Sequence, residues 1–120
     1  MKKLVKIVTK VHLSTKRNYK ERMFNNKILS MQKARKFEYD YWDGDRNHGY
    51  GGYKYIPGKW TEVAKKLIKL YKLNEKSKVL DVGCGKGFLL YEIKKLIPKI
   101  EVSGFDISKY GIKNSKKEIK

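Results

Sequence analysis

The stretch from Lys78 to Asp106 constrains the fold of this chain more than any other. It contains a short apolar segment at residues 78–82, a turn with three glycines at residues 83–87, a stretch of helical periodicity that ends at Pro98, and a second apolar segment before Asp106. A helix of this length between two strands is the usual connection of a parallel pair. The sequence therefore predicts a βαβ unit and an α/β fold.

The turn glycines are Gly83, Gly85 and Gly87. A glycine has no Cβ, so the backbone can turn sharply and a ligand can lie against the main chain. The helix that follows begins with unpaired amide N–H groups, which favour an anionic ligand group. Asp106 comes directly after the second strand, where its carboxylate can accept hydrogen bonds from a ribose. A glycine turn followed about 20 residues later by an acidic residue is typical of nucleoside binding.

The glycine spacing distinguishes between nucleoside cofactors. Here it is G-x-G-x-G, whereas dinucleotide sites use G-x-G-x-x-G, and Phe88 stands where their third glycine would be. Asp81 lies two residues before the first glycine, where a carboxylate repels a pyrophosphate but attracts an ammonium or a sulfonium group. The stretch therefore favours a ligand that carries both an amino acid and a nucleoside.

Residues 79–87, VLDVGCGKG, closely resemble motif I of the class I S-adenosylmethionine-dependent methyltransferases, and residues 104–108, GFDIS, resemble their acidic second motif. The resemblance covers about Trp60 to Lys120. It implies the N-terminal part of a Rossmann-like class I methyltransferase domain, of order βαβα, with S-adenosylmethionine as cofactor. The positions that it assigns to the cofactor are Asp81, Gly83, Cys84, Gly85, Gly87, Asp106 and Ile107.

The resemblance also implies a role for several of these positions. Asp81 would approach the ammonium group, the backbone at 83–85 would contact the methionine part, Asp106 would hold the ribose, and Ile107 would pack on adenine. It assigns no catalytic base. The domain of this family has seven strands and the sequence supports two, so we expect residues 60–120 to be an incomplete domain. An unpaired edge of its sheet would favour self-association.

Residues 1–59 are expected to form an arm, a helix and a lid-like segment. Residues 4–13 alternate between apolar and polar, which predicts a strand or an extended arm. Lys16 to Tyr39 is predicted to be one helix with an apolar stripe at Phe24, Ile28 and Met31.

Two further helices are expected around the βαβ unit. Residues 61–73 should form an amphipathic helix with Thr61 as its N-cap, and Ser108 should cap the last helix. The buried face of the connecting helix is predicted at Leu89, Ile93, Leu96 and Ile97.

Residues 39–60 are dense in glycine and aromatic side chains and lack helical periodicity. We interpret them as a lid in which Tyr50, Tyr53 and Tyr55 line the site, because tyrosine offers rigid, amphipathic contact area. A turn packed on the core, or a dimer contact, is the alternative. Asp43, Asp45 and His48 lack the spacing of a calcium or zinc site, so no metal is predicted.

The net charge is +18, with 30 Lys and Arg against 12 Asp and Glu. Such a charge is compatible with an RNA partner. Only four of the basic residues are arginine, however, and arginine is the residue that phosphate-reading sites favour. Cys84 is the single cysteine, which is typical of a reducing compartment, and no stretch is long enough to span a membrane. We therefore expect a cytoplasmic protein.

These observations predict a methyltransferase that acts on a small-molecule or metabolite acceptor. Two alternatives remain open. One is an RNA methyltransferase that uses the basic surface, and the other is a non-catalytic fragment or binding module with the same fold.

Overall fold

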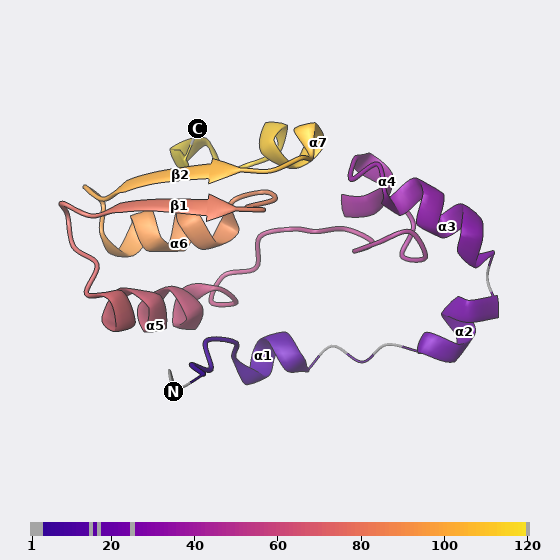
Figure 1. Cartoon of the computed structure of the whole chain (residues 1–120), viewed down its shortest axis with the longest axis horizontal. Helices are drawn as coiled ribbons and strands as arrows, with labels where there is room; N and C mark the ends of the chain where they lie inside the picture. Colours follow the sequence, from indigo (N-terminus) through magenta and orange to yellow (C-terminus); the bar gives the residue numbers. More distant parts are fainter. Residues whose placement is uncertain (1–3, 15, 17, 25, 120) are drawn as a thin grey trace.

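The computed structural model describes residues 4–14, 16, 18–24 and 26–119 (Figure 1). Its elements, in chain order, are α1 (Lys10–Leu13), α2 (Tyr19–Phe24), α3 (Lys27–Ala34), α4 (Tyr39–Trp42), α5 (Thr61–Tyr71), β1 (Lys78–Val82), α6 (Phe88–Leu96), β2 (Glu101–Phe105), α7 (Lys109–Lys113) and the 3₁₀ turn η1 (Lys117–Ile119). Among them, no helix is long and apolar enough to cross a membrane.

The two strands form a parallel sheet, and α6 connects them. Their register runs from Lys78 opposite Glu101 to Val82 opposite Phe105. The βαβ unit and the α/β class predicted from the sequence are therefore confirmed. Because parallel strands run in the same direction, the glycine turn and Asp106 lie at the same edge of the sheet, which is where the strands end.

The core lies between the sheet and two helices. Figure 1 shows α6 beneath the strands and α5 beneath α6. The most deeply buried side chains there are Ala64, Ile93 and Ile100, and burial of each isoleucine is worth about 1.5–3 kcal/mol. The apolar residues packed around them are Leu67, Leu73, Val79, Leu89, Ile97 and Val102. This confirms most of the predicted face of α6, although Leu96 is 40% exposed.

The opposite face of the sheet is open in the described part of the chain. The side chains that point away from α6 are highly exposed, at 67% for Leu80, 74% for Val82 and 64% for Phe105. Strand residues alternate between the two faces, so the helices bury one set and leave the other uncovered.

The predicted single helix from Lys16 to Tyr39 is wrong. It is divided into α2 and α3, and α3 ends at Ala34, well before α4. Asn26 has φ 42°, a left-handed conformation that interrupts an α-helix and that asparagine tolerates better than most residues. Positions 17 and 25 lie outside the described residues. The expected apolar stripe is exposed, at 89% for Phe24 and 74% for Ile28, so these side chains do not pack on the core.

Two smaller predictions also need correction. No strand forms at residues 4–13: residues 10–13 form the helical turn α1, while residues 4–9 have no regular structure, which agrees with the alternative of an arm only there. Thr61 begins α5 but does not cap it, because its hydroxyl donates to Glu92 and Trp60 stands at the cap position. The predicted cap of α7 is confirmed, since Ser108 Oγ accepts a hydrogen bond from the Gly111 amide at 2.8 Å.

Candidate functional site

Hydrogen bonds join the glycine turn to the end of β2. The amides of Gly83 and Cys84 both donate to the Phe105 carbonyl, at 2.7 and 3.1 Å. The carboxylate of Asp106 accepts the Gly85 amide through Oδ2 and the Ser108 amide through Oδ1, each at 2.7 Å. The structure therefore brings together the two motifs that the sequence placed at one edge, and it holds the Asp106 carboxylate in one orientation.

The three glycines of the turn have different surroundings, although each has a positive φ of 57–83°. Among the residues that the structure describes, a Cβ on Gly83 would have no atom within 4 Å, whereas a Cβ on Gly85 would lie 2.6 Å from Cη2 of Trp42. A Cβ on Gly87 would collide with Ile119. The open main chain of the turn is therefore at Gly83, directly after Val82 ends β1.

The side chains beside Gly83 are acidic and electrostatically coupled. Asp81 is half-buried, and burial, followed by the charge of Asp106, raises its pKa. Burial also raises the pKa of the Cys84 thiol, and the two carboxylates raise it further. A cationic group placed here would relieve the repulsion between the carboxylates. Ile107, the position that the resemblance assigned to adenine, is 75% exposed.

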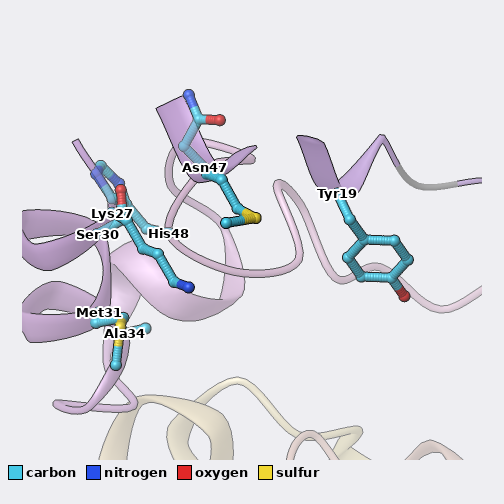
Figure 2. A pocket seen from close by; sticks show the side chains of 8 residues that line it. Tyr19, Lys27, Ser30, Met31, Ala34, Asn47 and His48 are labelled. Carbon is cyan, nitrogen blue, oxygen red and sulfur yellow. The ribbon is translucent and has the colours of Figure 1, made fainter. Parts of the chain in front are cut away.

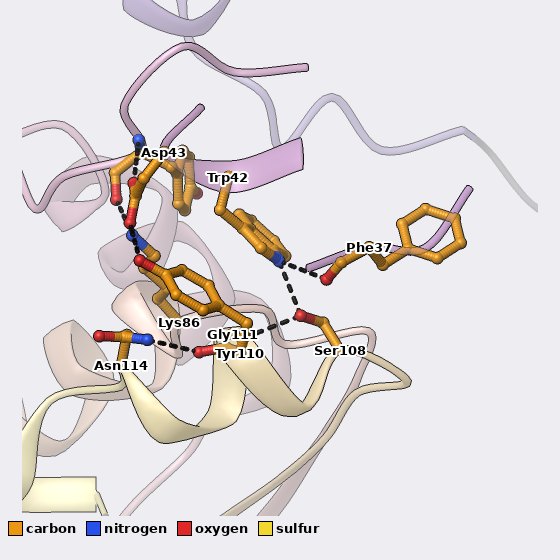
Figure 3. Close-up of polar contacts among 9 residues, drawn as sticks. Phe37, Trp42, Asp43, Lys86, Ser108, Tyr110, Gly111 and Asn114 are labelled. Carbon is orange, nitrogen blue, oxygen red and sulfur yellow. Dashed lines mark hydrogen bonds and ion pairs between the residues drawn. The ribbon is translucent and has the colours of Figure 1, made fainter. Parts of the chain in front are cut away.

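Trp42 covers the turn from the N-terminal part of the chain (Figure 3). Its ring packs on Gly85, and it is only 6% exposed. Its Nε1–H donates to Ser108 Oγ at 2.8 Å and to the Phe37 carbonyl at 3.1 Å. Through this one side chain, α4 contacts both the glycine turn and the residue that caps α7.

Asp43, the next residue, makes an ion pair with Lys86 of the turn (Figure 3). Lys86 Nζ lies 2.8 and 2.7 Å from the two oxygens of Asp43, and it also donates to the Tyr53 carbonyl at 2.8 Å. The Tyr110 hydroxyl and the Tyr53 amide complete the shell around Asp43 at 2.7 and 3.0 Å. Burial acts to raise the pKa of Asp43, but these hydrogen bonds outweigh burial and hold the pKa below its usual value.

Two of the three tyrosines predicted to line a lid lie together, since the ring centroids of Tyr50 and Tyr53 are 4.6 Å apart. Tyr50 stacks on Trp42 with ring centroids 5.4 Å apart, and Tyr53 stacks on Phe88 at 5.1 Å, so both are close to the turn. Burial, followed by Tyr50 and other neighbours that include Asp81, raises the pKa of Tyr53 to about 12. Tyr55 instead packs on α6, where its hydroxyl donates to the buried carboxylate of Glu92. The lid role remains a prediction.

A separate cavity of about 400 Å³ lies between α2, α3 and the segment after α4 (Figure 2). Figure 2 shows the ring of His48 beside Ser30 and the side chain of Lys27 extending into the cavity. Within the described residues, Nδ1 of His48 is buried without a hydrogen-bond partner. The other residues that line the cavity are Tyr19, Met23, Met31, Ala34 and Asn47.

Sequence reasoning missed the contacts that Trp42, Asp43, Lys86 and Tyr110 make around the turn. The sequence shows only that Lys86 stands between two turn glycines, where a lysine is usually solvated. Its burial, to 5% exposed, becomes apparent in the structure. No spacing rule connects it to Asp43, which lies 43 positions earlier. Among the residues that the structure describes, no three His, Cys, Asp or Glu side chains are grouped as metal ligands.

The fold and the site together define a class. A parallel βαβ unit whose glycine turn and strand-end carboxylate meet at one edge is the arrangement of nucleoside-binding α/β domains.

The family follows from comparison with known proteins. The family model described as a methyltransferase domain matches residues 73–120, which confirms the resemblance drawn from the two motifs. Residues 73–120 are therefore similar to a methyltransferase domain. Neither the curated proteins nor the solved structures include one that matches the chain.

Proposed function

We propose that this chain binds S-adenosylmethionine where β1 and β2 end, and that it takes part in methyl transfer to a small-molecule acceptor. The observation that carries the proposal is the 2.7 Å hydrogen bond between the Asp106 carboxylate and the Gly85 amide. It joins the acidic motif to the glycine turn, and the matched methyltransferase domain includes both.

The residues at this edge fit the cofactor. The main chain at Gly83 is open, so the methionine part of the cofactor can lie against it. Asp81 and Asp106 offer negative charge to a ligand that carries both an ammonium and a sulfonium group. The side chain of Ile107 is exposed for contact with a flat apolar ring. Cys84 contributes backbone and a small side chain; its raised pKa keeps the thiol protonated near neutral pH, which does not suit a nucleophile.

Methyl transfer mainly requires that the donor and the acceptor are aligned and that water is excluded from the site. When bound, S-adenosylmethionine supplies a methyl group on a positively charged sulfur, which departs as a neutral thioether. Asp81 would orient the ammonium group. The lone pairs of Asp106 not used by the Gly85 and Ser108 amides would accept the ribose hydroxyls. Trp42 and Tyr53 would shield the turn from solvent.

A small-molecule acceptor is the first candidate, because only four of the 30 basic residues are arginine, which is the residue that phosphate-reading sites favour. RNA is the second candidate, and the net charge of +18 is what supports it. A binding module that keeps the fold without the reaction is the third.

Isothermal titration of S-adenosylmethionine into the chain tests the proposal. We expect one molecule to bind per chain, and Asp106→Asn to weaken binding at least tenfold. Glu101→Gln is the matched control, because Glu101 lies at the other end of β2 in an exposed ion pair with Lys78. Absence of binding to the folded wild-type chain at millimolar cofactor would refute the proposal.

Salt dependence separates the two acceptor classes. Affinity for an RNA substrate should fall steeply as salt rises from 50 to 200 mM, because bound phosphates release counterions. Turnover of a small-molecule acceptor should change little over the same range.

A further inference from the structure

The ion pair between Asp43 and Lys86 is unusual for the glycine turn in which it lies. Lys86 is 5% exposed, and all of the hydrogen-bonding capacity of its ammonium group is used: two contacts reach Asp43 and one reaches the Tyr53 carbonyl. Burial of a lysine is costly, and an apolar pair of similar volume often gives equal or greater stability. The pair is therefore better explained by the position that it enforces than by stability.

The ion pair positions residues 42–53, which we call the covering segment, against the glycine turn. Asp43 connects this segment to the turn through Lys86 and to α7 through the Tyr110 hydroxyl. On one side of the ion pair, Trp42 packs on Gly85; on the other, Tyr53 stacks on Phe88 at the start of α6. The pair thus determines which side chains of the covering segment face the turn.

The covering segment also borders the part of the turn at Gly83 that the described residues leave open. Gly83 has free space around it, while Gly85 is covered by Trp42. A ligand that lies on the open main chain at Gly83 therefore meets the covering segment at Trp42, which packs on Gly85, and the ion pair fixes that boundary.

We propose that Asp43 and Lys86 are positioning residues of the methyl-donor site, which hold the covering segment against the glycine turn so that it forms one wall of the space at Gly83. This inference rests on the proposed function. It adds two residues that touch neither the donor nor the acceptor and that act through Trp42.

The chain contains its own control for a purely structural role. Next to the covering segment, Tyr55 and Thr61 both donate to Glu92, a carboxylate that is 1% exposed on α6. This second contact also holds an N-terminal segment on α6 through a buried acid, but it lies in the middle of the helix, away from the turn. Loss of it should reduce stability without changing the wall at Gly83.

The test is calorimetric titration of S-adenosylmethionine into the 120-residue chain and three variants, with thermal unfolding of each. Lys86→Met and Asp43→Asn should each weaken binding at least tenfold. Glu92→Gln should lower the melting temperature and leave the affinity within about twofold of wild type. If the first two variants are folded and bind like wild type, or if all three lose affinity equally, the inference is wrong. If the wild-type chain does not bind, the proposed function fails instead.

A second measurement needs no substitution and covers the case in which a variant does not fold. In wild-type chain saturated with S-adenosylmethionine, amide hydrogen exchange should slow at least threefold in a peptide spanning residues 42–53. A peptide within α5, at residues 61–71, serves as the internal control and should not change. Unchanged exchange at 42–53 in a chain that binds the cofactor would overturn the inference.

Discussion

Alanine at Gly83 and alanine at Gly85 should both lower the stability of the chain, but by different amounts and for different steric reasons. Both residues have positive φ, at 83° and 57°, so each substitution costs about 1–2 kcal/mol of backbone strain. At Gly83 nothing else is in the way. At Gly85 the new methyl group would lie 2.6 Å from Trp42, which must move and give up its hydrogen bond to buried Ser108, a further loss of about 1–3 kcal/mol.

The assay is thermal unfolding combined with titration of S-adenosylmethionine. In a chain of this size, 1 kcal/mol corresponds to about 4 °C, so Gly83→Ala should melt about 4–8 °C below wild type and Gly85→Ala about 8–20 °C below. Gly83→Ala should nevertheless lose cofactor binding, because its methyl group fills the open space. Equal melting temperatures for the two variants would refute the steric reasoning. Full binding by Gly83→Ala would refute the assignment of the open space to the cofactor.

Three further outcomes follow from the charges at the site. The pKa of Asp81 is raised in the folded chain, so its ionisation costs stability as pH rises above about 4. The variant Asp81→Asn should therefore have a higher melting temperature than wild type at pH 7 and should bind the cofactor more weakly. A melting temperature below that of wild type would contradict this. Because the pKa of Cys84 is raised, iodoacetamide at pH 7.5 should alkylate its thiol at least fivefold more slowly than the thiol of glutathione. The variant Asp81→Asn should increase the alkylation rate of Cys84. A rate equal to that of glutathione would show an accessible thiolate and contradict the raised pKa. The pKa of Asp43 is lowered, so its stabilising contribution is complete at neutral pH and is lost only as pH falls below about 4. In a Trp60→Phe variant, which removes the tryptophan that contacts His12, the fluorescence of Trp42 should stay constant from pH 8 to 5, and a transition near pH 6 would argue against the ion pair.

The βαβ unit was predictable because its signals are local. A strand, a glycine turn and a helix with its own periodicity follow each other between residues 78 and 105, and their order alone places Asp106 beside the turn. Ser108 as the cap of α7 was predictable for the same reason, since a cap bonds to an amide three residues away. The helix predicted from Lys16 to Tyr39 failed because periodicity does not report a backbone reversal such as that at Asn26.

Local patterns in the amino-acid sequence specify the parallel pair of strands, the glycine turn and the carboxylate beside it, because each depends on residues close together in the chain. The folded chain alone reveals that Gly83 is open while Gly85 lies beneath Trp42, and that Lys86 is buried against Asp43. Those contacts join residues 43 positions apart, and their formation depends on how a segment without helical or strand periodicity packs on the turn. Packing of that kind is set by shape and by the complete pairing of buried charge, neither of which leaves a regular spacing in the sequence.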